Sequence, residues 1–97
     1  ILVVTEFGRT VEGNGASSTD HGFGSISLLA GGSVNGGKIY TDWAGLNKLN
    51  ENRDLPSTLD LVDIFASLSH DILGVSKSNM NSVLPIKSNY NYYNLFS

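Results

Sequence analysis

The stretch ILVVT, residues 1–5, is four apolar residues followed by a threonine. A short apolar run of this kind predicts a strand that is buried on both faces, as in the middle of a parallel sheet. A lone buried strand needs other strands around it. We therefore expect residues 1–97 to be the carboxy-terminal segment of a single larger domain, with a processed or truncated chain as the alternative.

Two further strands are expected downstream of this stretch. Residues 6–24 contain five glycines and little periodicity, which predicts a long loop of a kind that is often functional. The run SISLLA, residues 25–30, predicts a second strand, and KIYT, residues 38–41, predicts a third. Between them, Asn35-Gly36 favours a tight reversal with positive φ.

One helix is predicted over residues 58–73, after a polar and irregular stretch at 42–54. Ser57 is its expected N-cap, and Gly74 is its expected C-terminal stop. Its apolar face comprises Leu61, Phe65, Leu68 and Ile72, at spacings of four, three and four. We expect this face to pack on the sheet, which gives an α/β fold class.

Two elements are expected after the helix. Residues 79–84 predict a second, shorter helix that Pro85 ends. The tail KSNYNYYNLFS, residues 87–97, is too aromatic for a disordered linker, and we expect it to pack along a surface.

The composition narrows the classes of partner. Six basic and nine acidic residues give a net charge of -3, and they are scattered along the chain. This distribution argues against nucleic acid as a partner. The absence of cysteine excludes disulfides, thiolate metal sites and a cysteine nucleophile within these residues. No apolar run approaches the length of a membrane span.

The long loop carries the candidate chemistry. Glu6 directly follows the first predicted strand, while Asp20 and His21 precede the second. Ligands of open α/β sheets collect outside the carboxyl ends of the strands. A carboxylate and an imidazole that meet there suit a divalent metal, with Asp20 as a co-ligand or as the partner that orients the imidazole.

Simpler interpretations stand beside this one. Asp20-His21-Gly22 is also the pattern of a turn in which the aspartate bonds its own backbone, and the residues alone favour the turn. Glu6 and Arg9, three residues apart, could equally form a local ion pair.

Other conspicuous residues favour structural roles. His70 lies near the carboxyl end of the predicted helix, where a cation suits the helix dipole. The paired glycines at 31–32 and 36–37 lack the strand–loop–helix order of a phosphate-binding loop, so no nucleotide site is assigned. Packing is the favoured role of the aromatic residues Trp43, Tyr90, Tyr92 and Tyr93.

Several motifs, in order, carry a family resemblance. VVTEFGRT is followed by TDHGFG, by LLAGGSVNGGKIYTDW and by RDLPSTLDLVDIFASLSHDILGV. Together they resemble the carboxy-terminal region of the bacterial domain-of-unknown-function-1501 family, over nearly the whole chain. That family is related to the alkaline phosphatase and sulfatase superfamily of metal-dependent hydrolases. The resemblance implies an alkaline phosphatase-like sandwich, with a mixed sheet flanked by helices.

The resemblance also implies roles for single residues. Glu6 stands where the superfamily has a metal-binding Asp, and His21 stands where a later His serves the second metal. Phe7 replaces a superfamily His and cannot coordinate, so one site must lose a ligand, recruit another or be absent. The implied cofactor is a divalent metal, zinc, calcium or magnesium, held partly by Glu6, His21 and Asp20. Arg9 would bind an anionic small-molecule substrate through its fork of donors.

Two functional hypotheses follow from the resemblance. The first is the carboxy-terminal part of a secreted hydrolase of phosphate or sulfate esters. Its nucleophile and remaining ligands would lie in the upstream part of the same protein, which is the expected partner of this segment. The second is a degenerate member that acts as a binding or structural protein, which the phenylalanine at position 7 favours. Full-length relatives commonly carry a twin-arginine signal, which implies a periplasmic or extracytoplasmic location in a bacterium.

Overall fold

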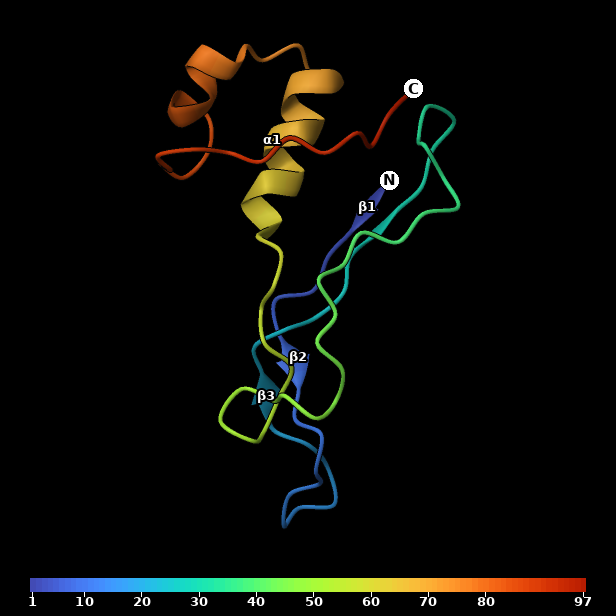
Figure 1. Ribbon diagram of the computed structural model, residues 1–97, viewed down its shortest axis with the longest axis vertical. Helices are drawn as coiled ribbons and strands as arrows, with labels where there is room; N and C mark the ends of the chain where they lie inside the picture. The colour runs from blue at the N-terminus through green and yellow to red at the C-terminus, as the bar shows by residue number, and fades with distance from the viewer. The chain divides into compact units, whose positions relative to one another are not determined.

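The computed structural model describes all of residues 1–97 and divides into two compact units (Figure 1). Unit 1 comprises residues 1–30 and 40–58, and unit 2 comprises residues 31–39 and 59–97. Unit 1 contains all the strands, and unit 2 contains all the helical structure. The chain therefore has the mixed α and β content that the sequence predicts.

Two small antiparallel sheets form unit 1. In the first, β1 (Leu2–Val3) pairs with β4 (Leu28–Leu29), and Leu2 lies opposite Leu29. In the second, β2 (Gly8–Arg9) pairs with β3 (His21–Gly22). Each sheet has only two strands, so much of its hydrogen-bonding capacity lies at an edge.

The prediction of a buried parallel strand over residues 1–5 is wrong. The regular strand is limited to β1, its pairing is antiparallel, and Ile1 and Val3 are 89% and 50% exposed. Residues 1–4 are apolar, as the prediction requires. Burial on both faces, however, requires strands on each side and a layer above and below, and β1 has one partner strand.

The other two predicted strands also differ from the structure. The strand expected at 25–30 is reduced to β4, and residues 38–41 form no strand. The turn between them is present, but its positive φ belongs to Gly37 (φ 73°) and not to Asn35-Gly36. A short run such as KIYT forms a strand only where a neighbour offers a hydrogen-bonding edge.

The predicted helix is confirmed and is shorter than expected. Helix α1 (Leu61–Asp71) begins after Asp60, whose carboxylate accepts the Val62 N–H at 2.9 Å. Asp60 is therefore the N-cap in place of Ser57, because an N-cap side chain must reach the amide two or three residues ahead. Just after the helix, Gly74 adopts the left-handed conformation (φ 72°) typical of chain reversal at a helix end.

The buried side of α1 is small and polar. The predicted apolar face is only partly buried, and Ile72 at its end is 52% exposed. Successive residues turn by about 100° around a helix, so residues two or six positions removed from that face point to roughly the opposite side. Three of the buried residues of α1 lie there, namely Asp63, Ala66 and Ser67, whereas the fourth, Ser69, lies one turn after Phe65 and borders the apolar face. Whether the apolar face packs on a sheet stays a prediction.

The carboxy-terminal tail explains this polar side. Asp63 Oδ1 accepts the backbone N–H of Asn91 at 3.2 Å, and Asp63 Oδ2 accepts the Asn91 side-chain amide at 3.1 Å. Ser67 Oγ accepts the backbone N–H of Tyr93 at 2.9 Å. The tail crosses α1 as an irregular chain (Figure 1), and its amides require acceptors because it has no strand partner there.

A 3-10 helix and the tail complete the core of unit 2. The short helix predicted at 79–84 is observed as the 3-10 helix η1 (Lys77–Ser82), two residues earlier. From it, Met80 enters a core with Ala66 and Tyr90, all at most 8% exposed. The prediction that the aromatic tail packs along a surface is thus confirmed.

Lys87 links the tail to the start of α1. Its Nζ lies 2.7 Å from Asp63 Oδ1 and 2.9 Å from Asp60 Oδ2. The hydrogen bond from Lys87, followed by that from the Val62 amide, lowers the pKa of Asp60. The hydrogen bonds to Asp63 and then to Asp60 raise the pKa of Lys87. The triad should therefore make stability depend on pH at both ends of the range.

We expect the Lys87→Gln variant to be less stable than the wild type by a margin that depends on pH. The lowered pKa of Asp60 stabilises the fold above its unfolded value of about 4, and this contribution is lost as pH falls through the folded pKa. The raised pKa of Lys87 stabilises below about pH 10 and is lost as pH rises through the folded pKa. The difference in melting temperature should therefore be largest between these limits. A difference that is constant across all pH values would contradict the assignment.

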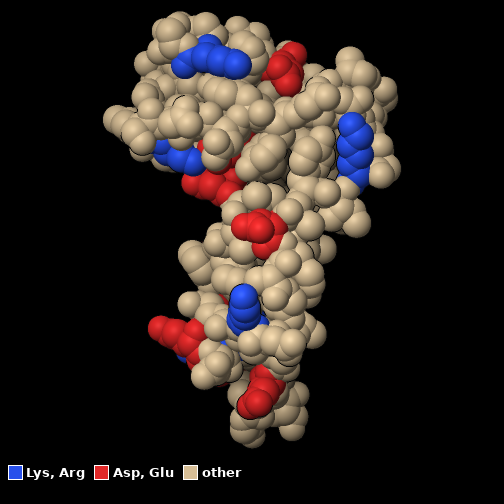
Figure 2. All heavy atoms as spheres, viewed as in Figure 1, with Lys and Arg blue, Asp and Glu red and all other residues tan.

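No helix of the chain combines the length and the apolar character needed to cross a membrane. On the face shown in Figure 2, acidic and basic side chains are interspersed, and uncharged residues cover most of the surface.

Candidate functional site

The β2–β3 hairpin of unit 1 positions His21. Arg9 lies opposite His21 in the ladder, and Gly8 lies opposite Gly22. Beyond the ladder, the Thr10 N–H donates to the Asp20 carbonyl at 3.1 Å. The backbone on either side of the imidazole is therefore fixed, while the His21 side chain itself is exposed.

The His21 ring stacks on Phe7. The ring centroids are 3.7 Å apart and the planes meet at 20°. The Arg9 guanidinium carbon lies 5.4 Å from the Phe7 centroid, so the phenyl ring contacts both groups. A stacked ring occupies the face of the imidazole, whereas metals bind the nitrogen lone pairs, which lie in the ring plane. The stack therefore orients His21 without covering its ligand atoms.

Asp20 lies in an ordered loop next to His21. Its Oδ1 accepts from the side-chain amide of Asn14 at 2.9 Å, and its N–H donates to Thr10 Oγ1 at 3.1 Å. Asn14 in turn accepts the N–H groups of Ala16 and Ser18. A shallow polar hollow of about 170 Å³ lies beside this loop, lined by Thr10, Glu12, Gly13, Asn14, Asp20, Asn52 and Arg53.

Glu6 and Arg9 do not form the local ion pair that their spacing allows. Arg9 instead donates from one guanidinium nitrogen to the Thr19 carbonyl at 2.8 Å, which ties it to the strand that carries His21. Glu6 is an exposed residue between β1 and β2. Nowhere do three or more histidine, aspartate or glutamate side chains gather closely enough to hold a metal ion. Glu6, Asp20 and His21 are thus not assembled into one cluster.

The segment 53–55 crosses the end of this hairpin, and the sequence gives little sign of it. The Arg53 carbonyl accepts the Val11 N–H at 2.9 Å, and the Leu55 carbonyl accepts the Gly24 N–H at 2.8 Å. Between them, Asp54 Oδ2 accepts the Phe23 N–H at 2.5 Å. Three consecutive residues therefore hold the backbone that follows β2 and β3.

Close approach explains the glycines of the HGFG motif. A Cβ on Gly22 would lie 2.9 Å from the Arg9 carbonyl oxygen and from Asp54 Cβ. A Cβ on Gly24 would lie 2.6 Å from the Pro56 carbonyl oxygen. Neither glycine has a positive φ. The glycines thus serve to admit a neighbouring backbone, where the sequence alone favoured a turn.

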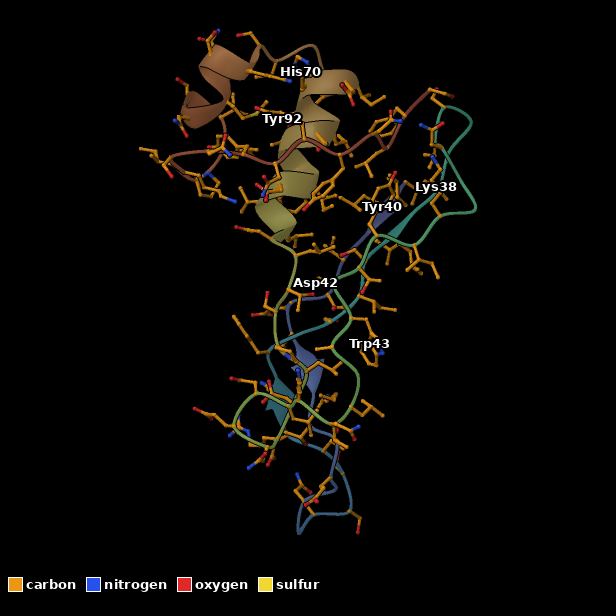
Figure 3. All side chains as sticks on the ribbon, viewed as in Figure 1. Lys38, Tyr40, Asp42, Trp43, His70 and Tyr92 are labelled. Atoms are coloured by element: carbon orange, nitrogen blue, oxygen red, sulfur yellow. The ribbon has the colours of Figure 1, made fainter.

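Outside the hairpin, His70 and Tyr90 have structural roles, whereas Trp43 is exposed to solvent. His70 Nδ1 donates to the Val75 carbonyl at 2.8 Å, and its ring meets the edge of Tyr92 at 5.7 Å (Figure 3). His70 therefore fixes the turn after α1. Tyr90 is buried in the core of unit 2, whereas Trp43 is 60% exposed, contrary to its predicted packing role.

The fold thus defines a protein of mixed α and β structure. It carries an exposed imidazole on an antiparallel hairpin. The family described as Protein of unknown function (DUF1501) matches residues 1–81, and the chain belongs to this family. Neither the curated proteins nor the solved structures gave a match.

Proposed function

We propose that this chain is the carboxy-terminal part of a metal-dependent hydrolase of phosphate or sulfate esters, and that His21 is one of its metal ligands. The observation that carries the proposal is the His21–Phe7 stack on the β2–β3 hairpin. It holds an exposed imidazole in a defined orientation with its nitrogens accessible. The resemblance to the alkaline phosphatase and sulfatase superfamily supplies the class of reaction.

The donor chemistry at the hairpin fits a divalent metal. Imidazole is a common ligand of zinc, and the carboxylates of Asp20 and Glu6 suit zinc, magnesium or calcium. These residues do not form a closed site among themselves. In the proposal, the remaining ligands and the nucleophile come from the rest of the same protein. When bound, the metal would polarise a phosphoryl or sulfuryl oxygen.

Arg9 has the chemistry to bind the anionic group of such a substrate. One guanidinium nitrogen is engaged by the Thr19 carbonyl, and Arg9 lies directly across the ladder from His21. The remaining N–H donors of its planar fork match the geometry of a phosphate or sulfate group. The contact with Phe7 holds the charged group near the imidazole.

The proposed partner of this segment is the remainder of the same domain. Unit 1 leaves several large apolar side chains in contact with solvent, and they are at least 59% exposed: Ile1, Phe23, Ile26, Leu28, Trp43 and Leu46. So much exposed apolar surface is typical of a surface that another part of a protein covers. In line with the resemblance, we place the whole protein outside the bacterial cytoplasm.

Hydrolysis assays on the full-length protein test this function. We expect the protein to hydrolyse p-nitrophenyl phosphate or p-nitrophenyl sulfate, to lose this activity with a chelator and to regain it with Zn²⁺, Mg²⁺ or Ca²⁺. The His21→Ala variant should lose about 100-fold or more in activity, because even residues that only support metal ligands contribute about 10–100-fold. Gly15→Ala, in the same unit but with no atom within 4 Å of the added Cβ, is the control. Activity that is unchanged by His21→Ala would favour the degenerate binding protein.

A further inference from the structure

We infer that Asp54 is the positioning residue for His21, an inference that rests on the proposed function. Asp54 lies 33 positions after His21 in the sequence, and its side chain is only 1% exposed. Its Oδ2 accepts the Phe23 N–H at 2.5 Å, two residues beyond the imidazole. Asp54 Cβ also lies where a side chain on Gly22 would have to be. One residue therefore contacts both positions that follow His21.

The hydrogen bond from Phe23 matters because β3 has no second partner strand. On one side, β3 pairs with β2, and on the other side its backbone would otherwise face an open edge. At this edge the Asp54 carboxylate accepts the Phe23 N–H, which a neighbouring strand would otherwise accept. The Leu55 carbonyl accepts the next N–H, that of Gly24. The backbone that carries His21 is thus held between β2 and segment 53–55, which fixes the ring against Phe7.

The second carboxylate oxygen of Asp54 argues for a role beyond simple packing. Asp54 Oδ1 is buried without any hydrogen-bond partner. The nearest cation is the Arg53 guanidinium at 3.7 Å, which is close enough for an ion pair and too long for a hydrogen bond. A buried carboxylate oxygen without a partner is unfavourable for folding, by about 1–3 kcal/mol. Most buried polar groups have a hydrogen-bond partner, so this oxygen calls for an explanation other than packing. Arg53 itself lines the hollow beside Asp20.

The role of Asp54 can be separated from a general effect on stability by a matched variant. Asp63 is also 1% exposed and also accepts a backbone N–H, but it belongs to unit 2. We expect Asp54→Ala to weaken the binding of Zn²⁺ alone by about 10–100-fold, the range found for residues that orient metal ligands. Asp63→Ala should leave Zn²⁺ affinity unchanged. Asp54→Asn, which keeps an acceptor oxygen for Phe23, should restore affinity to within a few-fold of the wild type.

NMR of the metal-free protein tests the positioning role of Asp54 without any metal binding. The ring protons of His21 should show an upfield NMR shift from the Phe7 ring current, and this shift should collapse in Asp54→Ala but not in Asp63→Ala. In the wild type, the Phe23 amide should exchange slowly with solvent, although the residue is 68% exposed. This last measurement requires no variant and therefore holds even if Asp54→Ala fails to fold.

The outcomes distinguish the two proposals. If the wild type binds no divalent metal, the proposed function fails, and the ring shift still decides the role of Asp54. If metal binds and neither affinity nor ring shift responds to Asp54→Ala, the role of Asp54 is overturned while the proposed function stands. Fast exchange at the Phe23 amide of the wild type would also overturn it.

Discussion

Replacing Gly24 with alanine should destabilise the protein by about 3 kcal/mol, at the upper end of what an added methyl group does in a packed site. The new Cβ would lie 2.6 Å from the Pro56 carbonyl oxygen and 2.7 Å from that of Leu55. The Leu55 carbonyl accepts the N–H of Gly24 itself. The clash therefore cannot be relieved without lengthening a hydrogen bond that anchors segment 53–55. Denaturant unfolding of the full-length protein measures the change.

Gly15→Ala is the matched control for this substitution. Gly15 lies in the same unit, its φ is not positive, and nothing lies within 4 Å of an added Cβ. Alanine there should be neutral or stabilising by up to about 1 kcal/mol, because it restricts the unfolded chain. Equal effects at the two positions would show that segment 53–55 does not pack against the hairpin.

Truncation of Met80 to alanine should destabilise unit 2 by about 2–5 kcal/mol, the range for deletion of a large buried side chain. Met80 is fully buried and packs with Ala66 and Tyr90 between α1, η1 and the tail. Met80→Leu, which nearly conserves volume, should destabilise by less than about 1.5 kcal/mol. Ile86→Ala, at a residue that is 83% exposed, should change stability by no more than about 0.5 kcal/mol. If Met80→Ala resembled Ile86→Ala, the assigned core would be wrong.

Local signals in the sequence predicted the elements that depend on local interactions. Helix α1 has the expected apolar periodicity, a side-chain cap and a glycine stop, and all of these act within a few residues. The cap itself moved from Ser57 to Asp60. The sequence does not show this, because serine and aspartate are both good N-cap residues and the helix begins at Leu61, three residues later than expected.

The buried face of α1 could not be predicted from its periodicity. The pattern of large apolar residues marks one side, whereas the tail packs on the small and polar side through Asp63 and Ser67. Hydrophobicity scales treat these residues as solvent-facing. They are buried here because they accept amides from a chain segment about 25 residues away, and that segment is irregular.

The metal-binding role of Glu6, Asp20 and His21 stays a prediction, whereas the structure shows how the hairpin that carries His21 is built. The sequence drew attention to His21, Asp20 and Arg9, and the structure places Arg9 opposite His21 in one ladder. The stack on Phe7 could not be predicted, because it depends on how the hairpin folds, and the sequence alone shows Phe7 only as the loss of a ligand. The contact from Asp54 was also missed, because it joins residues 31 positions apart. Only the glycines at 22 and 24 hinted that another backbone approaches.

The metal content of the full-length protein tests the central claim most directly. After purification without chelators, elemental analysis should find a divalent metal in the wild type and a much lower occupancy in His21→Ala. Arg9→Ala, which removes the neighbouring cation and leaves the imidazole, should retain the metal. A His21→Ala variant that holds as much divalent metal as the wild type would contradict the account.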